Sequence, residues 1–246
     1  MVRKCGEKVL AVGGRERVLP FVLIRKKGMR HIHMSIGHRG ELYLSMPWFC
    51  RESEVWNFVR QREDWLEGRL REFRERERLE TFLRGQGWVS ARGEKIPLRC
   101  ATGRGANAIK SGGGEWVLHL SEALEEPMRE RILRELLHGL ARRILPPRVG
   151  QLAREKELSH GRITVRDQSS RWGSCSSSRN LSFNWRLILL DPAAQDYIIF
   201  HELAHLVEMN HSPAFWKLLR ELYPETVTQD RWIKEKGSTI MALGRA

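Results

Sequence analysis

Three histidines and two glutamates lie close together in the stretch FHELAHLVEMNHSPAFW, residues 200–216. If this stretch begins as a helix, His201 and His205 are one turn apart and share a face, with Cβ atoms about 5–6 Å apart. Two imidazoles at that spacing can bind one metal ion, and Glu202 can reach a water molecule on the ion without coordinating the ion itself. The pattern is H-E-x-x-H, and it predicts a catalytic metal site.

A catalytic zinc ion usually has three protein ligands and one open position. His211 is the expected third ligand, but on a straight helix it would lie about 9 Å beyond His205 along the axis. The chain must therefore turn after Glu208. We expect Met209-Asn210 to make this turn, because asparagine tolerates the left-handed conformation that ends helices. Ser212-Pro213 is typical of the start of a new helix.

Glu208 is an alternative third ligand. It lies on the same helical face as His201 and His205, and it could bind the ion or orient one of the histidines. We favour His211, because side chains from one unbroken helix rarely surround an ion tetrahedrally. The prediction is one Zn²⁺ ion, or another divalent metal, on the three histidines, with Glu202 as the catalytic base.

The first 120 residues are expected to form a β-rich region with one long helix. Residues 1–50 hold short strand-like runs separated by glycine-containing turns. From Ser53, apolar residues recur at helical spacing, which predicts a helix over about 53–80. Residues 86–120 again have the pattern of strands.

Residues 121–246 are expected to form the metal-binding catalytic region. An amphipathic helix is predicted first, and Pro146-Pro147 is expected to end it. A strand at 162–167, a polar loop and a second strand at 181–190 follow. Asp191-Pro192 is typical of a helix start and would begin the helix that carries the first two histidines.

Composition narrows the class of protein. The chain has 246 residues, of which 41% are hydrophobic, and nine tryptophans, as expected for a globular fold with a sizeable core. Its four cysteines form no C-x-x-C pair, so there is no cysteine zinc ribbon, and a disulfide framework is not expected. No apolar run has the length of a signal segment or a membrane span, so we expect a cytoplasmic protein without a membrane partner.

The net charge of +13 favours polyanionic partners such as nucleotides or nucleic acid. Residues 15–39 carry a local excess of positive charge. Together with Arg171 and Arg186, which precede the metal motif, they could hold phosphate groups. A polyanion is therefore an alternative partner to a peptide.

The motif and its context resemble the YgjP-like family, a zincin-type family of metal-dependent hydrolases. The resemblance is most specific over residues 171–216, which contain RWGSC, NLSFNW, the histidine motif and NHSPAFW. It implies an α+β fold with a zincin-like catalytic half, in which helices pack on a small mixed sheet and H-E-x-x-H lies on a helix. It also implies that the 181–190 strand is a sheet edge where an extended peptide can pair. Arg171 and Trp172 are then candidates for the substrate cleft, although a tight polar turn explains them equally well.

Two neighbouring families share the ligand spacing. Metzincins have glycine at the position of Glu208 and need a methionine turn, for which Met241 is the downstream candidate. SprT-like proteases, which act on proteins crosslinked to DNA, often carry a cysteine zinc ribbon, which this chain lacks.

The predicted function is a zinc-dependent hydrolase, a metallopeptidase with a peptide or protein substrate, in which Glu202 activates metal-bound water. One alternative is a metal-dependent hydrolase of phosphoanhydrides such as nucleoside triphosphates. Others are a SprT-like DNA-associated protease and a nucleic-acid-binding protein with a structural metal. A structural zinc ion is normally closed by four protein ligands, so the open fourth position and Glu202 argue against the last of these.

Overall fold

The structure is a computed structural model, and it describes residues 2–37, 40–74 and 78–245. The chain divides into two compact units, residues 1–77 with 245–246 and residues 78–244. Residues 78–120, which the sequence analysis groups with the N-terminal region, belong to the second unit and contribute to its hydrophobic core.

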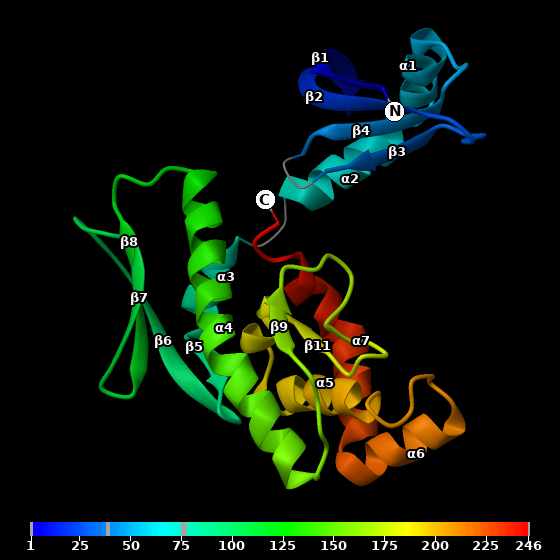
Figure 1. The fold of residues 1–246 in the computed structure, drawn as a ribbon. Coiled ribbons are helices and arrows are strands. Elements are labelled where there is room, and N and C mark those ends of the chain that lie inside the picture. Colours follow the sequence, from blue (N-terminus) through cyan, green and yellow to red (C-terminus); the bar gives the residue numbers. More distant parts are fainter. Residues whose placement is uncertain (1, 38–39, 75–77, 246) are drawn as a thin grey trace. The chain divides into compact units, whose positions relative to one another are not determined.

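A four-stranded sheet covered by two helices forms the first unit (Figure 1). Its strands are β1 (Val2–Val12), β2 (Arg15–Lys26), β3 (His33–Ile36) and β4 (Leu42–Pro47). The sheet order is β1-β2-β4-β3, with β2 parallel to β4 and the other neighbours antiparallel. The helices α1 (Glu52–Arg60) and α2 (Glu63–Arg74) place their apolar faces on this sheet, where Trp56 meets Phe21 with ring centroids 4.9 Å apart.

Within the range 53–80 predicted for one helix, the structure has α1 and α2, with a break at Gln61-Arg62, and the start of a third helix at Leu79. Residues 75–77 of that range lie outside the described residues. Val55 and Val59 of α1 and Leu66 and Leu70 of α2 are all buried in the same core. Each short helix thus buries the apolar residues predicted for its part of the range. The predicted helical periodicity is correct, but the predicted helix length is not.

The second unit contains two sheets and most of the helices. Its strands are β5 (Trp88–Ala91), β6 (Glu94–Gly103), β7 (Ala108–Gly112), β8 (Glu115–Ser121), β9 (Ile163–Arg166), β10 (Gly173–Cys175) and β11 (Leu181–Asn184). Its helices are α3 (Leu79–Gln86), α4 (Met128–Glu155), the 3₁₀-helix η1 (Trp185–Leu189), α5 (Pro192–Ala204), α6 (Pro213–Leu222) and α7 (Thr226–Ala242). The protein is thus of the α+β class.

The first sheet of this unit has the order β5-β6-β8-β7, which repeats the order and strand directions of the sheet in the first unit. The second sheet has the order β10-β11-β9. Helix α4 lies between the two sheets, in contact with β5 and β7 on one side and with β9 and η1 on the other (Figure 1).

The expectation that Pro146-Pro147 ends a helix is wrong, because α4 runs through both prolines to Glu155. Leu145, Val149 and Leu152 continue the buried face of the helix beyond and around the prolines. Burying these three side chains contributes about 4.5–9 kcal/mol, and the two internal prolines cost about 6 kcal/mol. Continued burial is therefore large enough to offset the broken backbone hydrogen bonds.

The expectation of an edge strand at 181–190 is also wrong. The strand ends at Asn184, whose side chain accepts a hydrogen bond from the Arg186 backbone N–H at 3.2 Å and so caps η1. Moreover, β11 is the central strand, paired antiparallel with β10 and parallel with β9. The outer strand that contacts α5 is β10.

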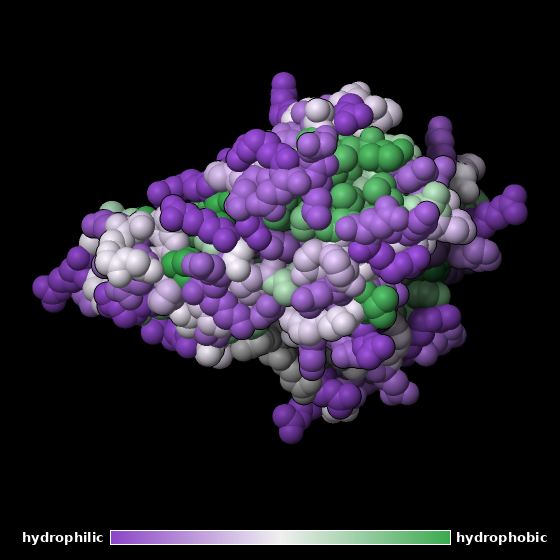
Figure 2. All heavy atoms as spheres, turned by 90° about the horizontal axis from the view of Figure 1, so that it is seen from below, coloured by the Kyte–Doolittle hydropathy of each residue, from purple (hydrophilic) through white to green (hydrophobic). Residues whose placement is uncertain are grey.

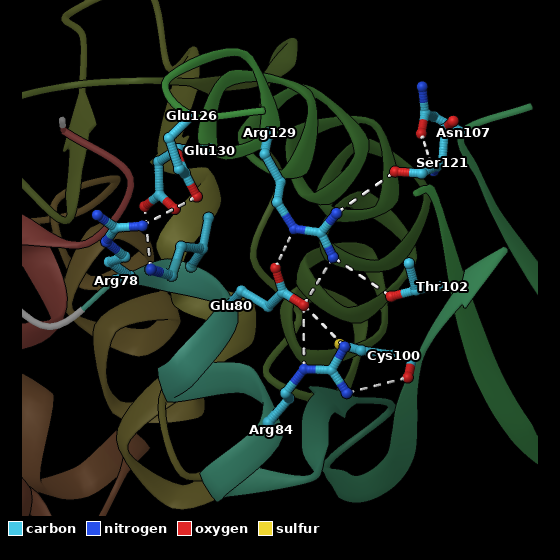
Figure 3. A network of polar contacts seen from close by, with 11 residues as sticks. Arg78, Glu80, Arg84, Cys100, Thr102, Asn107, Ser121, Glu126, Arg129 and Glu130 are labelled. Atoms are coloured by element: carbon cyan, nitrogen blue, oxygen red, sulfur yellow. Dashed lines mark hydrogen bonds and ion pairs between the residues drawn. The ribbon is translucent and has the colours of Figure 1, made fainter. Parts of the chain in front are cut away.

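A network of charged groups ties α3 to α4 and to the first sheet of this unit (Figure 3). Arg129 of α4 donates to both carboxylate oxygens of Glu80 and also to Thr102. Arg84, which lies on α3 like Glu80, also donates to Glu80. The hydrogen bond from Arg129 lowers the pKa of Glu80 to about 2, although burial opposes this shift. Close by, Glu130 accepts the Leu79 backbone N–H at 3.0 Å and caps the start of α3.

All four cysteines are free thiols, as the sequence predicts. Among the described residues no helix is both long enough and apolar enough to cross a membrane.

Candidate metal centre

Helix α5 carries the first two histidines. It begins where predicted, because the Asp191 carboxylate accepts the Ala193 backbone N–H at 3.2 Å and Pro192 occupies the first turn. It ends at Ala204, with His205 as its C-cap, which is earlier than the sequence suggests. The Glu208 N–H still bonds to the Ala204 carbonyl at 2.9 Å, so the helical turn persists beyond His205.

His211 returns to these histidines through a turn that differs from the predicted one. Among the described residues other than glycine, a positive φ occurs only at Arg92, Glu157 and Arg179, so Asn210 is not left-handed. Instead, the Asn210 carbonyl accepts the Ser212 N–H at 2.7 Å and closes a tight turn. Ser212 then caps α6 as predicted, since its hydroxyl accepts the Phe215 N–H.

The structure brings the three predicted ligands together. One nitrogen from each of His201, His205 and His211 can be chosen so that all three lie within 4.8 Å of one another. The Nε2 atoms of His201 and His211 are 3.0 Å apart. Two ligands at about 2.05 Å from a tetrahedral zinc ion would be about 3.4 Å apart, so the donor set fits such an ion with a small adjustment.

The orientation of His205 also suits a metal ligand. Its Nδ1 lies 3.0 Å from the backbone carbonyl of Glu208, which accepts only from a protonated nitrogen. This contact leaves the Nε2 lone pair free for an ion and fixes the plane of the ring. Glu208 therefore contributes through its backbone, and its carboxylate is not part of the histidine cluster found among the described residues.

The ionisation of these histidines favours a cation. Burial, with the neighbouring His205 and His211, lowers the pKa of His201 to about 4. Burial also lowers the pKa of His205, although the Glu208 carbonyl opposes this shift. Both imidazoles are thus neutral at neutral pH, as metal ligands must be.

Phe215 packs against one side of the histidine cluster. Its sequence pattern predicts only a place on an apolar helix face. Its ring centroid lies 5.0 Å from that of His201, 4.6 Å from His205 and 4.7 Å from His211. The side chain is completely buried, so it holds the three imidazoles from one side. Its position four residues after His211, on a capped helix, was the only signal in the sequence.

Glu202 lies beside the cluster, with only 6% of its surface exposed. Burial raises its pKa to about 8, and the charge of Arg171 partly opposes this shift. Its side chain packs against Gly173 of β10, where a β-carbon would be only 2.5 Å from Glu202 Cγ. No local sequence pattern indicates this role for Gly173.

The two candidate cleft residues have different surroundings. Arg171 is exposed and close enough to Glu202 to affect its ionisation. Trp172 instead approaches Gly237 of α7, since its indole Nε1 would be 3.3 Å from a β-carbon there. The side chain of Asn184 fixes the backbone of the loop that leads to Trp172. It donates to the carbonyls of Gln168 and Arg171 at 2.8 and 3.0 Å.

The other proposed cationic groups are Arg186 and the basic stretch at 15–39. Arg186 is completely buried and donates to Asp167 at 2.6 Å and to the Leu243 carbonyl at 2.8 Å, which makes it a structural residue. The basic stretch at 15–39 belongs to the first unit, and its residues 38 and 39 lie outside the described residues.

Met241 lies inside α7, where its sulfur is 3.2 Å from the side-chain nitrogen of Asn184. The aromatic Phe215, and not Met241, packs against all three imidazoles. A metzincin would instead have a methionine turn.

Comparison with known proteins agrees with this geometry. No curated protein and no solved structure is significantly similar to the chain. The sequence model of one family, described as YgjP-like, metallopeptidase domain, matches residues 30–236. This match covers most of the chain and includes all three histidines and Glu202. The chain therefore belongs to the YgjP-like metallopeptidase family.

Proposed function

We propose that the protein is a zinc-dependent metallopeptidase whose catalytic region, residues 121–246, has a zincin-like arrangement. The observation that carries this proposal is the convergence of three imidazoles, the first of which is followed in the chain by the buried carboxylate of Glu202. Membership of a metallopeptidase family supports the same reaction class. A divalent cation on His201, His205 and His211 would supply a Lewis acid and make a coordinated water more acidic.

Glu202 is the proposed general base. Its carboxylate accepts a proton from the attacking water and returns it to the leaving amine. In the absence of a cation, burial keeps this group protonated near neutral pH. A cation bound to the histidines would favour the ionised form of Glu202. The carboxylate would therefore be ready to accept a proton when the metal is bound.

The strand β10 is the proposed docking edge for an extended peptide. The backbone N–H of Ser176 donates to the carbonyl of Asn180, just before β11, and the carbonyl of Trp172 accepts the N–H of Asn184 at the end of β11. Because backbone groups alternate in direction along an antiparallel strand, those of Gly173 and Cys175 point to the outer edge. A peptide could pair with them as an added strand, next to Glu202.

Apolar surface near the ligands also favours a peptide substrate. Val207 and Met209, in the segment between the second and third ligands, are 57% and 48% exposed. Figure 2, seen from the end of the second unit where α6 lies, shows hydrophobic side chains gathered in one area of this face among hydrophilic ones. Apolar residues of a substrate would find partners on such a surface.

The deciding experiment combines metal analysis with hydrolysis. We expect purified protein to contain about one zinc ion per chain and to cleave casein or fluorogenic peptides. The variant Glu202→Gln should keep its metal and lose at least about 100-fold in kcat, as expected for removal of a general base. Glu221→Gln, an exposed residue of α6, is the matched control. Unchanged hydrolysis by Glu202→Gln would overturn the proposal.

Two further variants separate the candidates for the third ligand. His211→Ala should lose the metal, whereas Glu208→Gln should retain it, because only the backbone of Glu208 contacts His205. The same preparations should be tested on nucleoside triphosphates. Hydrolysis of these compounds without any peptide cleavage would favour a phosphoanhydride hydrolase instead.

A further inference from the structure

A pocket of about 830 Å³ lies on the β9–β11 sheet and is separate from the histidine cluster. Its polar walls come from three arginines and several hydroxyl groups, among them Arg162, Arg166, Arg171, Thr164, Ser174 and Ser182. No aspartate or glutamate of the described chain lines it.

The pocket occupies the face of the sheet opposite α5. On β10, Gly173 faces Glu202, so the next residue, Ser174, points to the other face, because side chains alternate along a strand. Ser174 pairs with Ser182 of β11, and Ser182 pairs with Thr164 of β9. These three hydroxyl-bearing residues therefore form one polar row across the sheet. The row lies on the face of the sheet opposite the one that Glu202 contacts.

The three arginines of this pocket form no ion pair within the described part of the chain. The charge of Arg171 acts on Glu202, although the two form no ion pair. By contrast, Arg129, Arg148 and Arg186 of the same unit each bind a carboxylate. Positive groups gathered in one pocket repel one another, and a bound anion removes this repulsion.

Ser182 provides a second, independent indication of a ligand. Only 7% of this residue is exposed, and its Oγ has no hydrogen-bond partner among the described residues. Buried hydroxyl groups nearly always have a partner, because leaving one without a partner costs about 1–3 kcal/mol. A ligand oxygen in the pocket would accept this hydrogen bond.

We infer that this pocket binds a carboxylate group of the substrate, and that the protein prefers acidic peptides. The inference rests on the proposed peptidase function. Arg166 of β9 and Ser182 of β11 line the pocket together on this face of the sheet. They can bind an aspartate or glutamate of a substrate that extends from the edge at β10 over this face.

The test compares peptides that differ only in charge. A cleaved fluorogenic peptide is varied at each position near the scissile bond, with aspartate against asparagine, at 150 mM salt. We expect one position at which aspartate raises kcat/KM about tenfold, the effect of one charge-assisted hydrogen bond. Arg166→Gln and Ser182→Ala should each remove most of this preference. Arg104→Gln, an exposed arginine directly after β6, should leave it unchanged.

Two design choices keep the result interpretable. Arg171 is not substituted, because its charge also acts on Glu202. Ser182→Ala removes a hydroxyl without a protein partner, so its thermal stability should equal or exceed that of the wild type. A smaller acid preference in this variant then reflects lost binding rather than lost folding.

A binding measurement separates this inference from the proposed function. Labelled aspartate and asparagine peptides are titrated with Glu202→Gln, and fluorescence anisotropy reports binding without turnover. Tighter binding of the aspartate peptide that depends on Arg166, without hydrolysis by the wild type, would support the pocket and refute the peptidase proposal. Hydrolysis or binding with no acid preference at any position, or a preference unchanged in Arg166→Gln, would overturn the pocket assignment.

Discussion

Gly173 and Glu202 are packed so closely that no side chain fits between them. A β-carbon on residue 173 would lie 2.5 Å from Cγ and 2.6 Å from Oε1 of Glu202. The missing side chain lets β10 approach α5 and confines the carboxylate beside the histidines. In the proposed mechanism, the outer strand β10 would thus position the general base as well as offer an edge to a peptide.

Gly173→Ala should therefore impair catalysis without removing the metal. The added methyl group must displace the Glu202 side chain, and a misplacement of about 1 Å costs on the order of 100-fold in rate. We expect kcat to fall by about that factor while zinc content stays near that of the wild type. Gly139→Ala is the control, because a β-carbon there meets nothing within 4 Å. Equal kcat values for both variants would refute the positioning role.

Phe215→Leu should weaken metal binding, because the ring packs against all three imidazoles. Removing a group that orients metal ligands typically lowers metal affinity about 10-fold to 100-fold. The measurement is competition with a chromophoric zinc chelator. Leu219→Ala, which removes another fully buried side chain of α6, controls for lost stability. It should destabilise the protein by about 2–5 kcal/mol without the same loss of affinity.

Local chemistry explains what could be predicted from the sequence. Asp191 and Ser212 cap the helices that carry the ligands, and both bond to backbone groups two or three residues away. The spacing of His201 and His205 follows from helix geometry alone. Such features depend only on neighbours in the sequence, so the sequence alone predicts them.

Features that depend on distant residues were predicted wrongly or not at all. The strand that contains Phe183 appeared to be an edge, yet pairing with β9 and β10 makes it central. Pro146 was expected to end a helix that burial of Val149 and Leu152 carries onward. The contact of Gly173 with Glu202 joins residues 29 positions apart, and nothing in local spacing encodes it.

Removal of the metal should lower the stability of the second unit. The ion would bind α5 and the loop before α6 together, and it has no comparable site in the unfolded chain. Zinc at about 100 times its dissociation constant stabilises a folded protein by about 3 kcal/mol. We expect a chelator to lower Tm by several degrees and zinc to restore it. In His211→Ala, neither addition should shift Tm, and an equal shift in that variant would contradict the site.

Glu80→Gln should destabilise the protein in a pH-dependent way. Hydrogen bonding to Arg129 lowers the pKa of Glu80 from 4.5 to about 2 in the folded state. A lowered carboxylate pKa stabilises the fold above about pH 4.5, and this contribution disappears as the pH falls towards 2. The variant should thus be less stable by about 2–3 kcal/mol at pH 7, since one pKa unit corresponds to about 1.4 kcal/mol and the pair is partly exposed.

Urea unfolding followed by tryptophan fluorescence between pH 7 and pH 3 measures this difference. The gap between wild type and Glu80→Gln should narrow steadily below pH 4.5, because Glu80 then binds a proton in the unfolded state while it stays ionised in the folded state until the pH approaches 2. Glu122→Gln is the control, since that carboxylate and its partner Arg104 are 55% and 95% exposed and the pair should contribute little. A gap that stays constant down to pH 3 would show that Glu80 acts through packing rather than through its charge.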